Sequence, residues 1–242
     1  MILSDLFRIL LWQPLFNLLI FFYLYLPGND FGIAIIALTV LIRLILWPWQ
    51  KKAIYSQLVL QKIQPKIKEL QKKYKNDKEK LGREFLKLTR SQKVNPFFGT
   101  FITFLQLPIL IALYRVFWRG VNEESLQYLY SFIKRPETLN PSFLGLIDLS
   151  QPNISLAVLL GVVLFLQQRS LMPRQKTGKS FANLFQTQML YFMPVFMTLI
   201  FLKLPSALAL YLIISTVFSI LQQKIAKREL DEYEKRRDEK TN

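Results

Sequence analysis

The chain has 242 residues, 52% of them hydrophobic, and its 32 Lys and Arg residues against 16 Asp and Glu residues give a formal net charge of +16 at pH 7. It contains no Cys and no His. This composition excludes disulfides, thiolate nucleophiles, thioether lipid anchors and Cys-based metal sites, and it removes the usual general base at neutral pH. Several apolar stretches are long enough to cross a bilayer, so a basic membrane protein with several spans is predicted.

The first apolar segment, residues 6–26, allows two interpretations. It is long enough for a span, with residues 27–30 as its outer turn. It also suits a helix that lies flat in the outer membrane interface. Charge does not decide between them, because both place every basic loop on the same side. The segment has no basic leading region and no small-residue cleavage site, which argues against a cleaved signal peptide.

Five further segments qualify as spans, because about 20 residues at 1.5 Å per residue cover the hydrocarbon core of ~30 Å. They are residues 31–49, 96–117, 154–171, 189–202 and 206–221. Only three residues separate the last two, and Pro205 among them favours a helix break. These two segments are therefore expected to form a tight hairpin.

Charge asymmetry predicts the orientation of the five spans. Residues 50–93 contain 14 basic and four acidic residues, and residues 169–179 contain four basic residues and no acid. Residues 119–153 are nearly balanced, with three basic and four acidic residues. Basic loops stay in the cytoplasm, so the first two connections are predicted inside and the balanced one outside.

The largest basic connection, residues 51–93, has the pattern of a charged helical hairpin. Apolar residues recur near a helical period on both arms. Asn76 and Asp77 mark the turn between the arms, and Pro65 interrupts the first arm. The cytoplasmic tail, residues 224–242, contains seven basic and six acidic residues and is predicted to be a solvated helix.

Arg43 distinguishes this chain from a generic helical bundle. It lies twelve residues into its span, about 18 Å from the outer end. A lipid-facing Arg at this depth costs from about 2.5 to above 10 kcal/mol, so the side chain is expected to face water or an anion. Every Asp and Glu lies outside the five spans. No carboxylate of this chain is therefore expected beside Arg43 at membrane depth, unless a loop folds inward.

Polar side chains of four spans could line one hydrated, positively charged cavity around Arg43. They are Thr39 one turn before it, Thr103 and Gln106, Gln167 and Gln168, and Tyr211, Ser215 and Ser219. Two other interpretations stay open. Arg43 could extend along its helix to the inner headgroups, and the polar residues could form hydrogen bonds between helices.

Short motifs follow one another in a fixed order over roughly residues 12–224. They are FGIAII at 31–36, Thr39 with Arg43, QPKI at 64–67, VNP at 94–96, QLPI at 106–109, ALY at 112–114, FMPV at 192–195, LPS at 204–206, LY at 210–211 and QQ at 222–223. Each motif alone is weak. Their order resembles that of the YidC/Oxa/Alb membrane protein insertases.

The resemblance implies an all-α membrane protein. Its parts are a five-transmembrane-helix core with a cytoplasmic helical hairpin, within residues 31–242, and an N-terminal interfacial helix on the outer side, within residues 1–30. It also implies a hydrophilic groove, open to cytoplasm and lipid, in which an Arg receives polar or acidic parts of a substrate. Arg43 occupies the matching position, and Thr39 and Gln167 match other groove positions. The tail of this chain departs from the longer, more basic tail of relatives that bind ribosomes tightly.

The predicted function is therefore that of an insertase and chaperone for nascent membrane proteins, not an enzyme, and without a cofactor. The expected substrate groove consists of Arg43, Thr39, Gln106, Gln167, Thr103, Tyr211 and Ser215. Expected partners are nascent membrane proteins and the lipid bilayer, with the Sec translocon and the ribosome as further candidates. The expected location is the bacterial plasma membrane, with the C-terminus in the cytoplasm.

Three other classes of function compete with this one. A transporter or channel would use Arg43 to bind an anionic solute, although no intramembrane carboxylate for proton coupling and no internal repeat is evident. An intramembrane enzyme would have only Ser, Thr, Tyr and Lys for its chemistry. A passive scaffold would show no insertion activity when purified into liposomes.

Overall fold

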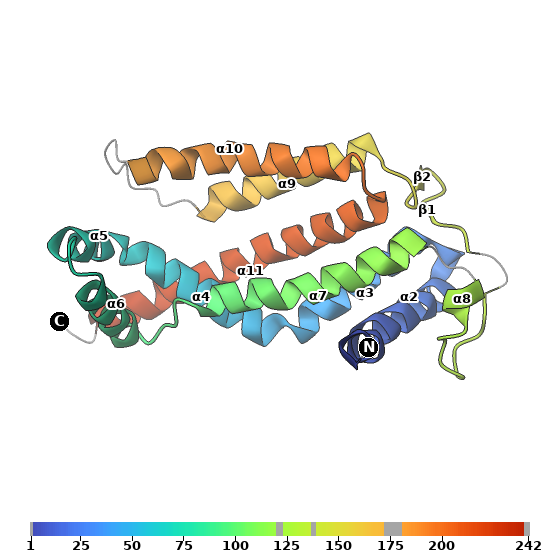
Figure 1. The fold of residues 1–242 in the computed structure, drawn as a ribbon, viewed down its shortest axis with the longest axis horizontal. Coiled ribbons are helices and arrows are strands. Elements are labelled where there is room, and N and C mark those ends of the chain that lie inside the picture. Colours follow the sequence, from blue (N-terminus) through green and yellow to red (C-terminus); the bar gives the residue numbers. More distant parts are fainter. Residues whose placement is uncertain (1, 120–122, 137–138, 172–180, 240–242) are drawn as a thin grey trace. The chain divides into compact units, whose positions relative to one another are not determined.

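A computed structural model describes residues 2–119, 123–136, 139–171 and 181–239 (Figure 1). Most of these residues are helical, and β1 (Ser142–Phe143) pairs with β2 (Ile147–Asp148) in one short antiparallel hairpin. The helices are α1 (Ile2–Phe7), α2 (Gln13–Tyr25), α3 (Phe31–Ile45), α4 (Trp47–Lys62), α5 (Gln64–Lys73), α6 (Lys78–Ser91), α7 (Phe98–Arg119), α8 (Glu123–Leu126), α9 (Ile154–Leu171), α10 (Phe181–Phe201) and α11 (Ser206–Glu239). A π-helical turn (Arg8–Trp12) joins α1 to α2, and a 3-10 turn (Pro27–Asn29) precedes α3. The protein is an all-α membrane protein, as predicted.

The predicted spans and the observed helices agree best where the sequence has clear end signals. The predicted segment 154–171 coincides with α9, and α11 begins at Ser206 directly after Pro205. However, α3 ends at Ile45 rather than at residue 49, because Pro48 belongs to the first turn of α4 and forces a new start. Helix α10 begins earlier than predicted, at Phe181. Helix α11 continues to Glu239 because its sequence contains no Gly or Pro.

Two described helical stretches are long and apolar enough to cross a membrane, Asp5–Tyr25 and Ser206–Glu232. Phe31–Ile45 and Trp47–Lys62 count as a third only if the two are taken together as one broken span. Three further apolar helices are shorter: Gln106–Phe117, Ile154–Ser170 and Gln188–Phe201. The five-span core therefore stays a prediction.

The chain forms two compact units. The first contains the described residues of Met1–Ile45, Leu105–Ser170 and Lys176–Ser219, and the second those of Leu46–Phe104, Leu171–Gln175 and Ile220–Asn242. The core of the first unit consists of apolar side chains from several helices and one loop. Its largest fully buried members include Phe16, Leu19 and Ile20 of α2, Ile35 and Leu38 of α3, Leu113 of α7, Leu149, Leu160 of α9, and Leu208 and Tyr211 of α11.

Two polar side chains, those of Gln13 and Asn17, attach α2 to the segment after α7 and α8 that contains Tyr128 and Tyr130; the Gln13 amide donates to the backbone oxygen of Tyr128 at 3.0 Å. Asn17, which is 1% exposed, accepts a hydrogen bond from the backbone N–H of Tyr130 at 2.7 Å. Its amide nitrogen donates to the backbone oxygens of Tyr128 at 3.0 Å and of Gln13 at 2.8 Å. The middle of α2 therefore contacts this segment directly.

Helices α9 and α10 lie side by side (Figure 1) and are in close contact at Gly161. A Cβ atom added there would lie 2.1 Å from Oγ1 of Thr198 and 3.4 Å from the backbone oxygen of Pro194. The Thr198 hydroxyl in turn donates to that same oxygen at 3.0 Å. Only glycine fits this contact without displacing Thr198.

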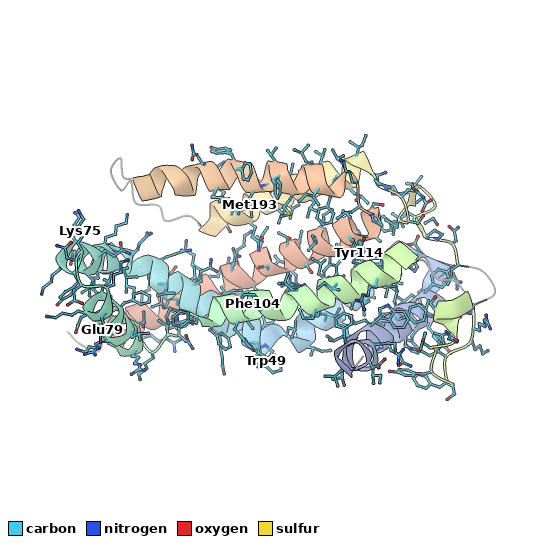
Figure 2. The ribbon with its side chains drawn as sticks, in the orientation of Figure 1. Trp49, Lys75, Glu79, Phe104, Tyr114 and Met193 are labelled. Carbon is cyan, nitrogen blue, oxygen red and sulfur yellow. The ribbon has the colours of Figure 1, made fainter. Side chains whose placement is uncertain are left out.

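In the second unit the predicted hairpin is confirmed as helical and broken where expected. Pro65 lies in the first turn of α5, and Asp77 caps α6 by accepting from the backbone N–H of Lys80 at 2.9 Å. Lys75 and Glu79 lie at and just after the turn between α5 and α6, and their side chains are exposed at that end of the hairpin (Figure 2).

The last turns of α11 pack against α4 within the same unit. Leu230, which is 3% exposed, forms a cluster with Val59 and Val94. Two ion pairs surround this cluster: Nζ of Lys51 lies 2.8 Å from Glu229, and Nζ of Lys62 lies 3.4 Å from Asp231.

We expect the apolar cluster, and not the ion pairs, to hold these helices together. Replacing Leu230 with Ala is expected to cost about 2 kcal/mol, because a buried leucine leaves a cavity. Replacing Glu229 with Gln is expected to cost less than about 1 kcal/mol, because exposed ion pairs contribute little. Hydrogen exchange of the α4 amides measures the loss of stability in each variant. Equal losses in the two variants would contradict the larger role of the apolar cluster.

Candidate functional site

Arg43 lies near the end of α3, surrounded by apolar sequence, and its side chain is only partly exposed. Its Nε–H group donates to the hydroxyl oxygen of Ser215 in α11 at 3.3 Å. These two residues are 172 positions apart in the chain. The cation thus faces another helix of the first unit at a polar position.

Two more of the predicted site residues join this contact. Tyr211, one turn before Ser215 on the same face of α11, is 1% exposed. The side-chain amide of Gln106 in α7 donates to the same Tyr211 hydroxyl. Arg43, Ser215, Tyr211 and Gln106 therefore form one polar cluster, built from three helices; we call it the Arg43 cluster.

Gln167 forms a second polar contact on α11. Its side-chain amide donates to the hydroxyl of Ser219 at 3.0 Å. Ser219 follows Ser215 by one helical turn, so the polar positions of α11 continue along one face. The predicted i, i+4, i+8 spacing of Tyr211, Ser215 and Ser219 thus corresponds to contacts with three other helices.

The remaining two predicted residues contribute less to this geometry. The hydroxyl of Thr39 is fully buried and donates to the backbone oxygen of Ile35 at 2.6 Å, within its own helix. Thr103 belongs to α7, but its side chain lies outside the described part of the structure. A role of either residue in a substrate groove stays a prediction.

The chemistry of the Arg43 cluster suits an anionic or carbonyl-rich partner. A guanidinium carries five N–H donors in a fixed fork that matches a carboxylate. The other members of the cluster are hydroxyls and an amide, which stabilise a charge without neutralising it. The interactions that these groups offer to a partner are hydrogen bonds and charge attraction.

Sequence reasoning did not identify the polar residues that fix the loops of the first unit, above all Asn17 and Asp30. Asn17 had a signal that could have been used, since it is the only strongly polar residue between Gln13 and Asn29. A lone amide in an apolar helix needs hydrogen-bond partners. Which backbone groups it meets depends on the fold.

Comparison with known proteins adds independent information. The family model described as "60Kd inner membrane protein" matches residues 21–234. A membrane protein insertase YidC of Syntrophobacter fumaroxidans is 35% identical over 217 residues, which cover 87% of this chain and 36% of the relative. The corresponding protein of Buchnera aphidicola subsp. Baizongia pistaciae is 36% identical over 222 residues (90% and 37%), and that of Wolinella succinogenes is 34% identical over 219 residues (90% and 37%). The chain thus spans little more than a third of the length of these relatives.

Proposed function

The chain belongs to the 60Kd inner membrane protein family, and from this premise we propose that it inserts nascent membrane proteins into the bilayer. The relatives compared above are named membrane protein insertases. The single observation that carries the proposal beyond these names is the contact between Arg43 and Ser215 inside the first unit. It gives an apolar helix a charged group directed at a polar face of α11.

The proposed mechanism is binding without covalent chemistry. A short polar tail of the nascent chain enters a hydrated groove around the Arg43 cluster. There, water and the polar side chains reduce the cost of moving peptide groups into the membrane. The adjoining apolar segment moves along the helix surfaces into lipid, and its burial drives the net process.

Arg43 gives this groove a preference for acidic tails. A carboxylate near a guanidinium in a partly dry site gains more than a neutral amide does. The attraction must stay moderate, because a tightly bound tail would not leave the groove. Ser215 and Tyr211, the other members of the cluster on α11, are neutral and add no opposing charge of their own.

Topology forms part of the proposal. We place five spans in the bacterial plasma membrane, with the α4–α6 hairpin and the C-terminus in the cytoplasm. We also place the segment before α3 at the outer surface, and the hydrogen bonds from Asn17, in its middle, to the backbone of the loop after α7 support this placement. A helix spanning the bilayer would put Asn17 near the midplane, about 15 Å from that loop. Lipid, nascent chains, the Sec translocon and the ribosome are the proposed partners.

The test compares two tail variants of one client with a short translocated tail, one carrying Asp residues and one carrying Asn in their place. We define the acidic-tail preference as the ratio of their insertion rates into liposomes containing the purified protein. Arg43→Ala is expected to lower this preference roughly tenfold, the factor that corresponds to ~1.4 kcal/mol of lost attraction. Arg43→Lys keeps the charge and is expected to retain part of the acidic-tail preference.

Arg115→Ala is the matched control, because it also removes one guanidinium charge. Arg115 lies near the C-terminal end of α7, and its guanidinium lies over the Phe7 ring, 5.0 Å from the ring centroid. This variant is expected to leave the preference unchanged. If Arg43→Ala and Arg115→Ala have the same effect, Arg43 does not select acidic tails. If the purified protein inserts neither client, the insertase proposal itself fails.

A further inference from the structure

Helices α3 and α11, which supply Arg43 and Ser215, are both attached at their first turns to one short segment, residues 141–151. This segment contains the β1–β2 hairpin and belongs to the first unit. It is closed on itself by the backbone N–H of Leu149, which donates to the oxygen of Pro141 at 2.8 Å. Leu149 is fully buried. We call residues 141–151 the clamp segment.

The attachment to α3 runs through Asp30 and Gly32. One carboxylate oxygen of Asp30 accepts from the backbone N–H of Ile33 at 2.8 Å and caps α3, and the other accepts from the backbone N–H of Leu144. The ring of Phe143 covers Gly32 so closely that a Cβ atom there would lie 2.1 Å from the ring. The start of α3 is thereby fixed both by a charge-assisted hydrogen bond and by shape.

The attachment to α11 runs through backbone groups of the same segment. The N–H of Ser206 donates to the oxygen of Gln151, and the N–H of Ala207 donates to the oxygen of Leu149, both at 3.0 Å. The Ser206 hydroxyl donates to the oxygen of Asp148 at 3.2 Å. These bonds satisfy two of the N–H groups that the first turn of a helix leaves unpaired.

Because the rise and rotation per residue of a helix are fixed, these attachments determine which residues of α3 and α11 lie opposite each other. From Phe31 to Arg43 the rise is about 18 Å, and from Ser206 to Ser215 it is about 14 Å. Sliding one helix by a single residue moves its side chains by about 1.5 Å and rotates them by about 100°. The contact between Arg43 and Ser215, at 3.3 Å, is already near the upper limit for a hydrogen bond. A slip of one residue would break it.

We infer that the clamp segment sets the register of α3 against α11, and that Asp30 is a positioning residue for Arg43. Asp30 acts through the hydrogen bond to Leu144, at the opposite end of α3 from the cation. The consequence for activity rests on the proposed function, since it requires that Arg43 selects acidic tails. The consequence for helix register does not depend on it.

Asp30→Asn separates the two roles of this carboxylate. An asparagine oxygen still caps α3 through Ile33, whereas its amide nitrogen cannot accept from the N–H of Leu144. Asp148→Asn is the matched control, because it removes a charge from the same hairpin. The side chain of Asp148 bonds only locally in the described structure, with one oxygen accepting from the N–H and hydroxyl of Ser150. Asparagine retains that oxygen.

Register is measured with two nitroxide labels in the full chain, attached at Leu44→Cys in α3 and Val217→Cys in α11. Both positions are exposed, and the chain has no other Cys. We expect one narrow distance distribution in the parent and in Asp148→Asn. In Asp30→Asn the distribution is expected to broaden or shift by about 1.5 Å, the rise of one residue. The acidic-tail preference of the unlabelled Asp30→Asn protein is expected to fall roughly fivefold, the factor given by about 1 kcal/mol of one lost hydrogen bond.

The outcomes separate the two proposals. An unchanged distance distribution in Asp30→Asn overturns the register inference, whatever the insertion assay gives. A changed distribution with full acidic-tail preference overturns the role of Asp30 in positioning Arg43. If Arg43→Ala also keeps the preference, the proposed function fails, while the distance measurement still decides the register inference.

Discussion

Asn17→Leu is expected to lower the free energy of unfolding by about 3 kcal/mol, because it removes three hydrogen bonds worth roughly 1 kcal/mol each. Leucine has the same number of side-chain heavy atoms as asparagine and a larger volume, so no cavity contributes. The lost partners are the backbone N–H of Tyr130 and the oxygens of Tyr128 and Gln13. The Tyr130 N–H loses its bond to the Asn17 side chain, which adds to the cost. Thermal unfolding of the purified protein in nanodiscs, followed by tryptophan fluorescence, measures the change.

The control for this prediction is Asn140→Ala. The Asn140 side chain is exposed and accepts from the backbone N–H of Ser142 at 3.2 Å. A local turn contact of this kind is worth less than about 1 kcal/mol. Equal destabilisation by both variants would mean that Asn17 does not fix α2 to the loop after α7, and the placement of that helix would lose its main support.

Gly161→Ala is expected to destabilise the α9–α10 pair by about 3 kcal/mol, the upper part of the range for overpacking. The new methyl group would lie 2.1 Å from the Thr198 hydroxyl oxygen, and the Pro194 oxygen behind it belongs to the backbone and cannot swing away. Thr198 is β-branched and donates to that oxygen, so its rotation is restricted as well.

The double-mutant cycle with Thr198→Ala tests the cause. Removing the hydroxyl provides the space that the methyl group needs, so the double variant is expected to regain most of the lost stability, with a coupling energy of about 2 kcal/mol. Thr198→Ala alone is expected to change stability by less than about 1 kcal/mol. Additive effects of the two substitutions would show that the two helices do not touch at Gly161.

The parts of the fold that could be predicted from the sequence are those with local signals. Pro65 predicted the break before α5, Asp77 predicted a turn and serves as a cap, and Pro205 predicted the start of α11. The end of α3 was misplaced because the apolar run continues through Trp47 and Trp49, which hides the restart imposed by Pro48. Length of an apolar run does not reveal a break inside it.

In the candidate site, too, features with a local sequence signal could be predicted, whereas contacts between distant residues could not. A charge within a long apolar segment is visible in the sequence, and so is the polar spacing of α11, which is why Arg43 and Ser215 could both be predicted as site residues. That they meet depends on helix packing between positions 172 residues apart. The clamp segment could not be predicted, because it acts mainly through backbone groups, and backbone groups carry no signature in the sequence.

The turn between α2 and α3 has a mechanical consequence. Only residues 26–30 join the two helices, and Gly28 (φ 86°) and Asn29 (φ 47°) reverse the chain within them. The Asn29 side chain also donates to the backbone oxygen of Tyr23 at 3.3 Å. So short a connection couples the two helices, so a displacement of the N-terminal helices is transmitted to α3 as strain instead of being absorbed by a flexible linker.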